Sequence, residues 1–136
     1  MHALSFVVEF GLDSFLAGLA VGSFALSKRH WLRLAFAFGA CDAAATLAGS
    51  LWAHRLQDFP ALPIYLLCAF LVARAVRSNR ALLYPLPVLL SVDNFFSGNP
   101  ASTAPALGFG SAVFVLLGLS VAAAFQRVFH VAQAEV

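Results

Sequence analysis

The chain has 136 residues, of which 62% are hydrophobic and only 10% are charged, and its mean hydropathy is +0.89. A soluble domain carries about 25% charged residues, so this composition excludes a water-soluble globule and predicts an integral membrane protein with the lipid bilayer as its main partner. The formal net charge of +2 is not gathered into a basic face, which excludes nucleic acid as an expected partner.

Five apolar segments are long enough to consider as membrane-spanning helices. In chain order they are residues 3–26, 32–53, 60–76, 81–98 and 105–126. About 20 helical residues cross the hydrocarbon core, so the third and fourth segments are at the short end of the range. The runs are continuous and rich in Ala and Leu, without the alternation that a transmembrane β-barrel requires. The sequence therefore predicts an all-α, polytopic transmembrane helix bundle that forms a single integral membrane domain over residues 1–136.

The basic residues between these segments predict their orientation. Seven of the eight follow the first, third or fifth segment, namely Lys28, Arg29, Arg33, Arg74, Arg77, Arg80 and Arg127. The opposite side receives only Arg55. Because cytoplasmic loops are enriched in Lys and Arg, we expect the N-terminus outside and the C-terminus in the cytoplasm.

An acidic motif occurs twice, in the first and fourth segments. Residues 10–18 read FGLDSFLAG and residues 90–98 read LSVDNFFSG, so that Asp13 matches Asp93 and the Phe and Gly after each Asp also match, at a constant offset of 80. The first and fourth segments run through the membrane in opposite directions. The second copy is therefore expected to be inverted with respect to the first, as in many secondary transporters.

A weaker similarity links the second and fifth segments. FAFGACDAAATLAG in the second is echoed by LGFGSAVFVLLG in the fifth. This alignment pairs Phe38-Gly39 with Phe109-Gly110 and Gly49 with Gly118, although the spacing differs by two residues. Repeat one would cover about 3–76 and a partial repeat two about 81–126. Three helices per repeat would make six, so either the protein works with five helices or a second protomer in a homo-oligomer covers the exposed face.

Four acidic residues lie within these apolar segments. Glu9 and Asp13 are four residues apart and share one helical face, Asp42 lies in the second segment, and Asp93 precedes Asn94 in the fourth. An ionised side chain at the bilayer centre costs about 2.5–3.5 kcal/mol, so four would cost roughly 10 kcal/mol. No basic residue lies deep enough to neutralise them. The carboxyl groups must therefore be protonated, solvated in a cavity or bound to a cation.

Oxygen ligands of this kind suit Mg²⁺, Ca²⁺ or Mn²⁺, whereas all four His residues lie near segment ends. The predicted metal ligands are Asp13, Asp93, Asp42, Glu9, Asn94 and Ser14. Asp13 and Asp93 would coordinate the ion, while Asp42 and Glu9 would assist or take up a proton. Alternatively, each acid only hydrogen-bonds a neighbouring helix. No catalytic or cofactor motif is present, so we expect no enzyme and no bound cofactor.

Small residues and prolines predict local features of the helices. Two stripes at four-residue spacing favour close helix packing, Ser14, Gly18 and Gly22 in the first segment and Ala40, Ala44 and Ala48 in the second. In the fourth segment Pro85 and Pro87 precede Asp93, and Asn99-Pro100 follows it. The prolines either break this helix near Asp93 or merely occupy its first turn and its end.

The motifs LDSFLAGLAVG, FG…G and SVDNFFSG resemble those of the MntP-type bacterial manganese efflux pumps, relatives of the lysine exporter superfamily. The resemblance covers roughly residues 5–53 and 86–118. It implies two three-helix repeats, each with an Asp in its first helix, in a bacterial inner membrane, and Mn²⁺ as the exported ion. This chain supplies five of the six spans. We therefore expect a proton-coupled exporter of a divalent cation. The alternatives are a small non-transporting membrane subunit or scaffold, and an exporter of small organic solutes.

Overall fold

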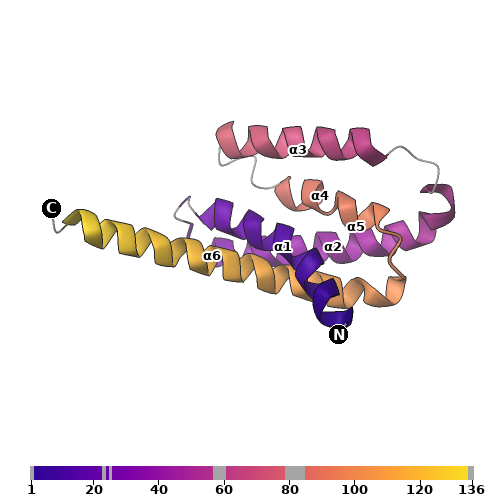
Figure 1. Cartoon of the computed structure of the whole chain (residues 1–136), viewed down its shortest axis with the longest axis horizontal. Coiled ribbons are helices and arrows are strands. Elements are labelled where there is room, and N and C mark those ends of the chain that lie inside the picture. The colour runs from indigo at the N-terminus through magenta and orange to yellow at the C-terminus, as the bar shows by residue number, and fades with distance from the viewer. Residues whose placement is uncertain (1, 23, 25, 57–60, 79–84, 135–136) are drawn as a thin grey trace.

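The computed structural model describes residues 2–22, 24, 26–56, 61–78 and 85–134, and every regular element among them is a helix, as predicted (Figure 1). The helices are α1 (His2–Gly22), α2 (Lys28–Leu56), α3 (Ala61–Ser78), α4 (Leu86–Leu90), α5 (Val92–Phe96), the short 3-10 helix η2 (Ala101–Thr103) and α6 (Ala104–Ala134). Each of the five predicted apolar segments contains helix.

The chain runs back and forth along one long axis (Figure 1). Helices α1, α3 and α6 run in one direction, and α2 and the α4–α5 pair run in the other. Within the described residues, two stretches are long and apolar enough to cross a membrane, Lys28–Trp52 in α2 and Ala101–Val128 in η2 and α6. The apolar stretches Gly11–Gly22 and Leu86–Phe96 are shorter.

Helix α6 is the centre of the bundle because it packs along both α1 and α2. Glycines allow the close approach. A Cβ atom on Gly18 would collide with the backbone of Val115, and a Cβ atom on Gly22 would collide with Ala122. The small-residue stripe predicted in the first segment therefore does serve packing.

The Ala stripe predicted for packing in the second segment is wrong. Ala40 and Ala44 are exposed on the outside of the bundle. The face of α2 that packs against other helices carries Gly39, Asp42 and Gly49, which are all buried. Periodic alanines on a helix are compatible with either face, so their spacing alone did not identify the packed one.

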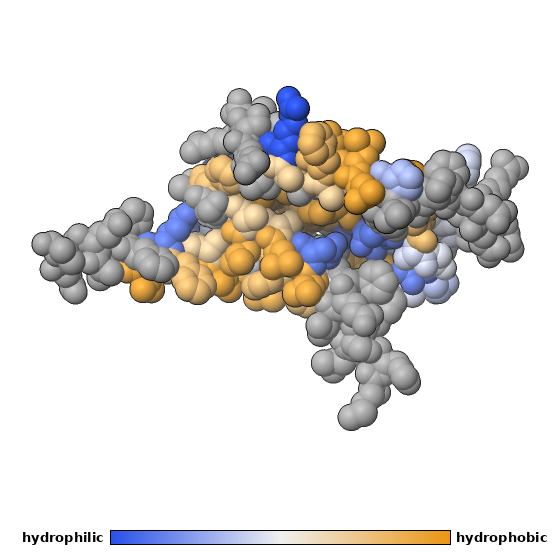
Figure 2. Space-filling model, turned by 45° about the horizontal axis from the view of Figure 1, so that its top comes forward, coloured by the Kyte–Doolittle hydropathy of each residue, from blue (hydrophilic) through white to orange (hydrophobic). Residues whose placement is uncertain are grey.

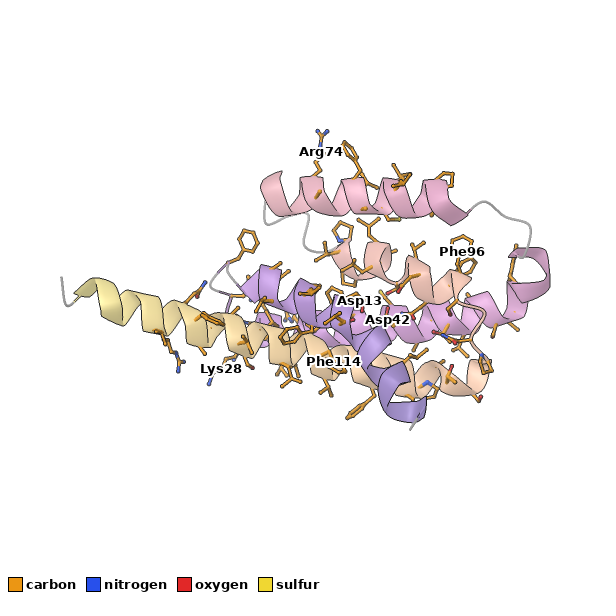
Figure 3. The ribbon with its side chains drawn as sticks, viewed as in Figure 1. Asp13, Lys28, Asp42, Arg74, Phe96 and Phe114 are labelled. Atoms are coloured by element: carbon orange, nitrogen blue, oxygen red, sulfur yellow. The ribbon has the colours of Figure 1, made fainter. Side chains whose placement is uncertain are left out.

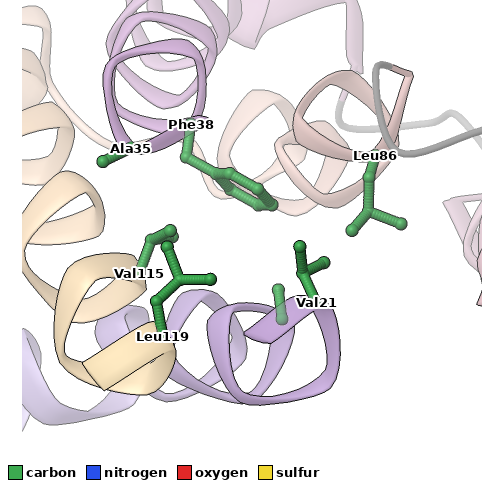
Figure 4. Packing of buried hydrophobic residues seen from close by; sticks show 7 residues of the cluster. Val21, Ala35, Phe38, Leu86, Val115 and Leu119 are labelled. Atoms are coloured by element: carbon green, nitrogen blue, oxygen red, sulfur yellow. The ribbon is translucent and has the colours of Figure 1, made fainter. Parts of the chain in front are cut away.

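The apolar core lies where four helices meet near the beginning of α2. It consists of Ala17, Val21, Ala35, Phe38, Leu86, Val115 and Leu119 (Figure 4). Farther along α2 the buried residues change from apolar, such as Phe38, to polar, beginning with Asp42. The same change occurs between Leu86 in α4 and Ser91 at its end. The apolar core therefore borders a buried polar region.

Large apolar side chains are also exposed over much of the outer surface. Hydrophobic residues dominate the middle of the face shown in Figure 2. The most exposed include Leu32, Phe36, Leu51, Leu66, Phe109 and Val128. Water-soluble monomers rarely expose apolar surface on this scale.

The predicted fourth segment is not one continuous helix. Pro85 is the N-cap of α4 and Pro87 lies in its first turn, where a missing backbone N–H does no damage. The interruption falls instead at Ser91, whose φ of −81° and ψ of 0° separate α4 from α5. The helix is therefore broken two residues before Asp93, but the prolines do not break it. Residues 81–84 of this segment lie outside the described residues.

Candidate functional site

Six polar side chains are buried among the described residues of this apolar bundle. They are Ser14, Asp42, Thr46, Ser91, Asn94 and Ser111. Four of the six come from α2 and from the α4–α5 pair, which lie side by side and run in the same direction (Figure 1). A buried polar group without a partner is costly, so such a cluster needs internal hydrogen bonds or a ligand.

Asp42 is held by a serine from the interrupted helix. Its side chain is only 2% exposed, and the Ser91 hydroxyl donates to its Oδ1 atom. The same hydroxyl oxygen lies 2.6 Å from the carbonyl oxygen of Pro87, a second acceptor. One turn farther along α2, the Thr46 hydroxyl donates to the backbone carbonyl of Asp42 at 2.9 Å.

The two Asp residues of the repeated motif have the same local geometry. The backbone N–H of Ser14 donates to Asp13 Oδ1 at 2.7 Å, and the backbone N–H of Asn94 donates to Asp93 Oδ1 at 2.8 Å. Asp13 interacts electrostatically with both Asp93 and Asp42, and Asp93 also interacts with Asp42. Figure 3 shows Asp13 and Asp42 close to each other in the middle of the molecule. Three helices thus bring one carboxyl group each to the same region.

Asn94 adds a neutral oxygen atom that accepts no hydrogen bond within the fold. Its side chain is 2% exposed, and its Oδ1 atom has no hydrogen-bond partner. Leaving a buried acceptor unsatisfied costs about 1–3 kcal/mol. This oxygen is therefore free to accept a hydrogen bond or to coordinate a cation.

The structure brings only some of the predicted site residues close to one another. Asp13, Asp42 and Asp93 are brought within electrostatic range, and Asn94 and Ser14 directly follow two of them. The Glu9 side chain lies outside the described part of the structure. Among the described residues, no three His, Cys, Asp or Glu side chains form a group tight enough to hold a metal ion. The three described carboxyl groups thus lie within electrostatic range of one another without forming such a group.

Sequence reasoning did not select Ser91 or Thr46 as site residues. Thr46 follows Asp42 by four residues and Ser91 precedes Asn94 by three, so helical spacing would have placed each on the face of a selected residue. The partnership between Ser91 and Asp42 joins positions 49 residues apart. Only the way in which the helices cross could reveal it.

Glycine contacts between the helices occur in matching pairs. Gly118 of α6 leaves no room for a Cβ atom beside the Phe15 carbonyl of α1, and Gly49 of α2 leaves none beside the Phe95 carbonyl of α5. Phe15 and Phe95 occupy the same place in the repeated motif.

The two remaining helices, α2 and α6, meet through a pair of glycines. Gly39 and Gly108 each pack against the carbonyl oxygen of the other. Gly49 follows Gly39 by ten positions, and Gly118 follows Gly108 by ten positions.

The structure gives different surroundings to the residues that the predicted alignment of the second and fifth segments paired. That alignment paired Phe38-Gly39 with Phe109-Gly110 and required a two-residue difference in spacing. Phe38 is 1% exposed whereas Phe109 is 75% exposed, and no neighbouring atom lies within 4 Å of a Cβ atom built on Gly110. In the structure Gly39 contacts Gly108 and not Gly110, so these surroundings do not support that alignment.

Over its described residues the protein is all-helical, with two helices long and apolar enough to span a membrane and with three carboxyl groups of the bundle in electrostatic range of one another. No protein-family model, curated protein or solved structure matches the chain.

Proposed function

We propose that the chain is an inner-membrane carrier, not an enzyme, that exports a divalent cation, Mn²⁺ in the simplest case, in exchange for protons. The observation that carries this proposal is that Asp13, Asp42 and Asp93, from three different helices of an apolar bundle, lie near enough to influence one another electrostatically. Carboxylates in a low-dielectric environment repel one another unless a proton or a cation lies between them. Oxygen ligands of this type favour hard divalent cations.

In this proposal Asp13 and Asp93 are the principal ligands and Asp42 is the third. Asn94 Oδ1 contributes the neutral oxygen that has no partner within the fold. The set is completed by Ser14 and Glu9. When the cation leaves, the carboxyl groups take up protons, so that the site does not remain as several bare anions. Exchange of cation against proton follows from this requirement.

We further propose that the bundle is an inverted repeat, with α1 and α2 related to α4–α5 and α6. The matching contacts of Gly118 with Phe15 and of Gly49 with Phe95 support this relation, as does the mutual packing of Gly39 and Gly108. Helices α1 and α4–α5 carry the repeated motif in opposite directions (Figure 1). In transporters built this way, the substrate site lies near the midplane, where the repeats meet.

The proposed orientation places five helices across the membrane with the N-terminus outside. The beginning of α2, which carries Lys28, and the ends of α3 and α6, which carry Arg74 and Arg127, lie at the same end of the molecule (Figure 1). The positive-inside rule assigns this end to the cytoplasm. A second protomer would cover the outer face of α1, where Leu12 and Leu16 are exposed.

A flux measurement with purified protein in proteoliposomes tests the proposal. We expect Mn²⁺ transport that depends on a proton gradient, and a decrease of about 10-fold or more for Asp13→Asn or Asp93→Asn, because each exchange removes a charged ligand. The matched control is Asp58→Asn, the same exchange between the second and third segments, which should leave transport unchanged.

Each alternative gives a different result in this experiment. Normal Mn²⁺ flux in both site variants would contradict the assigned ligands. Flux of amino-acid analogues without Mn²⁺ flux would indicate an exporter of organic solutes. Absence of flux for every solute would indicate a non-transporting subunit.

A further inference from the structure

We infer that Ser91 is a positioning residue of the cation site, which holds one oxygen of the Asp42 carboxylate so that the other oxygen is directed toward Asp13 and Asp93. The inference rests on the proposed function and adds a residue that does not itself bind the ion. Among the described hydrogen bonds, Ser91 supplies the one buried hydroxyl group that contacts a carboxyl group of the site on a different helix.

The location of Ser91 suits this role. Ser91 lies at the interruption between α4 and α5, two residues before Asp93. Its hydroxyl group donates a hydrogen bond to Asp42 of α2. Helix α2 is itself fixed by the close contacts of Gly39 with α6 and of Gly49 with α5. A single hydrogen bond therefore ties the carboxyl group of a firmly packed helix to the segment that carries Asp93.

The hydroxyl group of Ser91 also has a second acceptor. It has one proton to donate, and the Pro87 carbonyl oxygen lies 2.6 Å away as an alternative to Asp42. Rotation of the hydroxyl hydrogen from one acceptor to the other would release Asp42 without moving the serine. The orientation of Asp42 therefore depends on the geometry of the α4–α5 interruption.

The other half of the bundle lacks this pair, which argues against a purely architectural role. The position that matches Ser91 at the offset of 80 is Gly11, and the ring of Phe114 packs directly against it. If Gly39 is matched with Gly108, which it contacts, the position that matches Asp42 is Ser111. That half has no hydroxyl group at the position that matches Ser91 and no carboxyl group at the position that matches Asp42. The two helices there pack together without this hydrogen bond, which argues that it is not a general requirement of the packing.

Binding of Mn²⁺ to the purified full-length chain in detergent tests the inference, with free Mn²⁺ measured by its electron paramagnetic resonance signal. Hydrogen-bond partners of metal ligands typically contribute about 10–100-fold in affinity, so we expect a loss of that size for Ser91→Ala. Ser91→Thr keeps the hydroxyl and should restore most of the affinity. We also expect the spectrum of bound Mn²⁺ to change in Ser91→Ala, because Asp42 is no longer held in one orientation.

The matched control is Ser120→Ala. The Ser120 hydroxyl donates to the carbonyl of Leu116 one turn earlier in α6, as Ser91 can to Pro87, but it is exposed. This variant should bind Mn²⁺ like the wild type. An equal loss in both alanine variants, or wild-type affinity in Ser91→Ala, would overturn the inference. If Ser91→Ala does not purify as a folded protein, Ser91→Cys replaces it, because a thiol has similar size and is a weak donor. Wild-type affinity in that variant would equally overturn the inference.

Asp13→Asn and Asp93→Asn, measured in parallel, separate this inference from the proposed function. Absence of Mn²⁺ binding in the wild type, or unchanged binding in both Asp variants, would overturn the proposed site and the inference together. Loss of binding in the Asp variants with full binding in Ser91→Ala would overturn only the role of Ser91.

Discussion

Two glycines of α6, only eight residues apart, differ in what surrounds them. A Cβ atom on Gly118 would collide with the Phe15 carbonyl and the backbone of Leu19 in α1, whereas a Cβ atom on Gly110 would meet no neighbouring atom within 4 Å. Gly118 is therefore required by the close approach of two backbones. Gly110 has no such requirement and lowers helix propensity.

This difference predicts opposite effects of the same substitution. Gly118→Ala should lower the free energy of unfolding by about 1–3 kcal/mol, because α1 and α6 must move apart to admit the methyl group. Gly110→Ala should leave it unchanged or raise it by up to about 1 kcal/mol, because alanine is the better helix former. Denaturant titration of the purified protein in detergent measures both. Equal stability of the two variants would contradict the packing described for Gly118.

At the scale of elements, the α4–α5 pair differs from the other helices because it has an interruption on each side of Asp93. The first is at Ser91, and the second follows α5 at Gly98, whose φ of 67° lies in the left-handed region. No neighbouring atom lies within 4 Å of a Cβ atom built on Gly98. The conformation of the chain, and not crowding, therefore favours glycine there.

We expect Gly98→Ala to lower the free energy of unfolding by about 1–2 kcal/mol, because a residue with a Cβ atom is strained at this φ. Gly98→Asn should cost less, because asparagine adopts the left-handed conformation more readily. The same denaturant titration distinguishes the two. If Gly98→Ala were as stable as the wild type, the turn after α5 would not have the described conformation.

At the scale of the whole molecule, the proposed orientation predicts which loops a membrane-impermeant reagent reaches. Ser27 lies between α1 and α2, and Ser102 lies in η2 between α5 and α6, and both are exposed. In a variant whose Cys41 and Cys68 are replaced by alanine, we expect an impermeant maleimide to label Ser102→Cys in intact cells. It should label Ser27→Cys only after the membrane is opened.

Labelling of both positions after solubilisation in detergent serves as the control for reactivity. The opposite pattern would show that the chain has the reverse orientation. Labelling of both positions from outside would contradict the proposed number of crossings between them, since an odd number of membrane-spanning helices must separate two loops on opposite sides.

The sequence alone predicted the helical class and five segments that each contain helix. A continuous apolar run can be recognised from its own residues, whatever packs against it. It also matched Asp13 with Asp93 in a repeated motif, and in the structure each of them accepts a hydrogen bond from the backbone N–H of the next residue. Both properties are local, or repeat at a fixed offset. Both can therefore be detected in the sequence without the tertiary structure.

The tertiary structure alone decided which face of α2 is buried, that Gly39 pairs with Gly108, and where the fourth segment is interrupted. It alone showed the hydrogen bond from Ser91 to Asp42. These features depend on the depth and the angle at which helices cross, and residues 49 positions apart leave no periodic signal of their contact. Helical spacing marks the residues of one face, but only packing determines what that face meets.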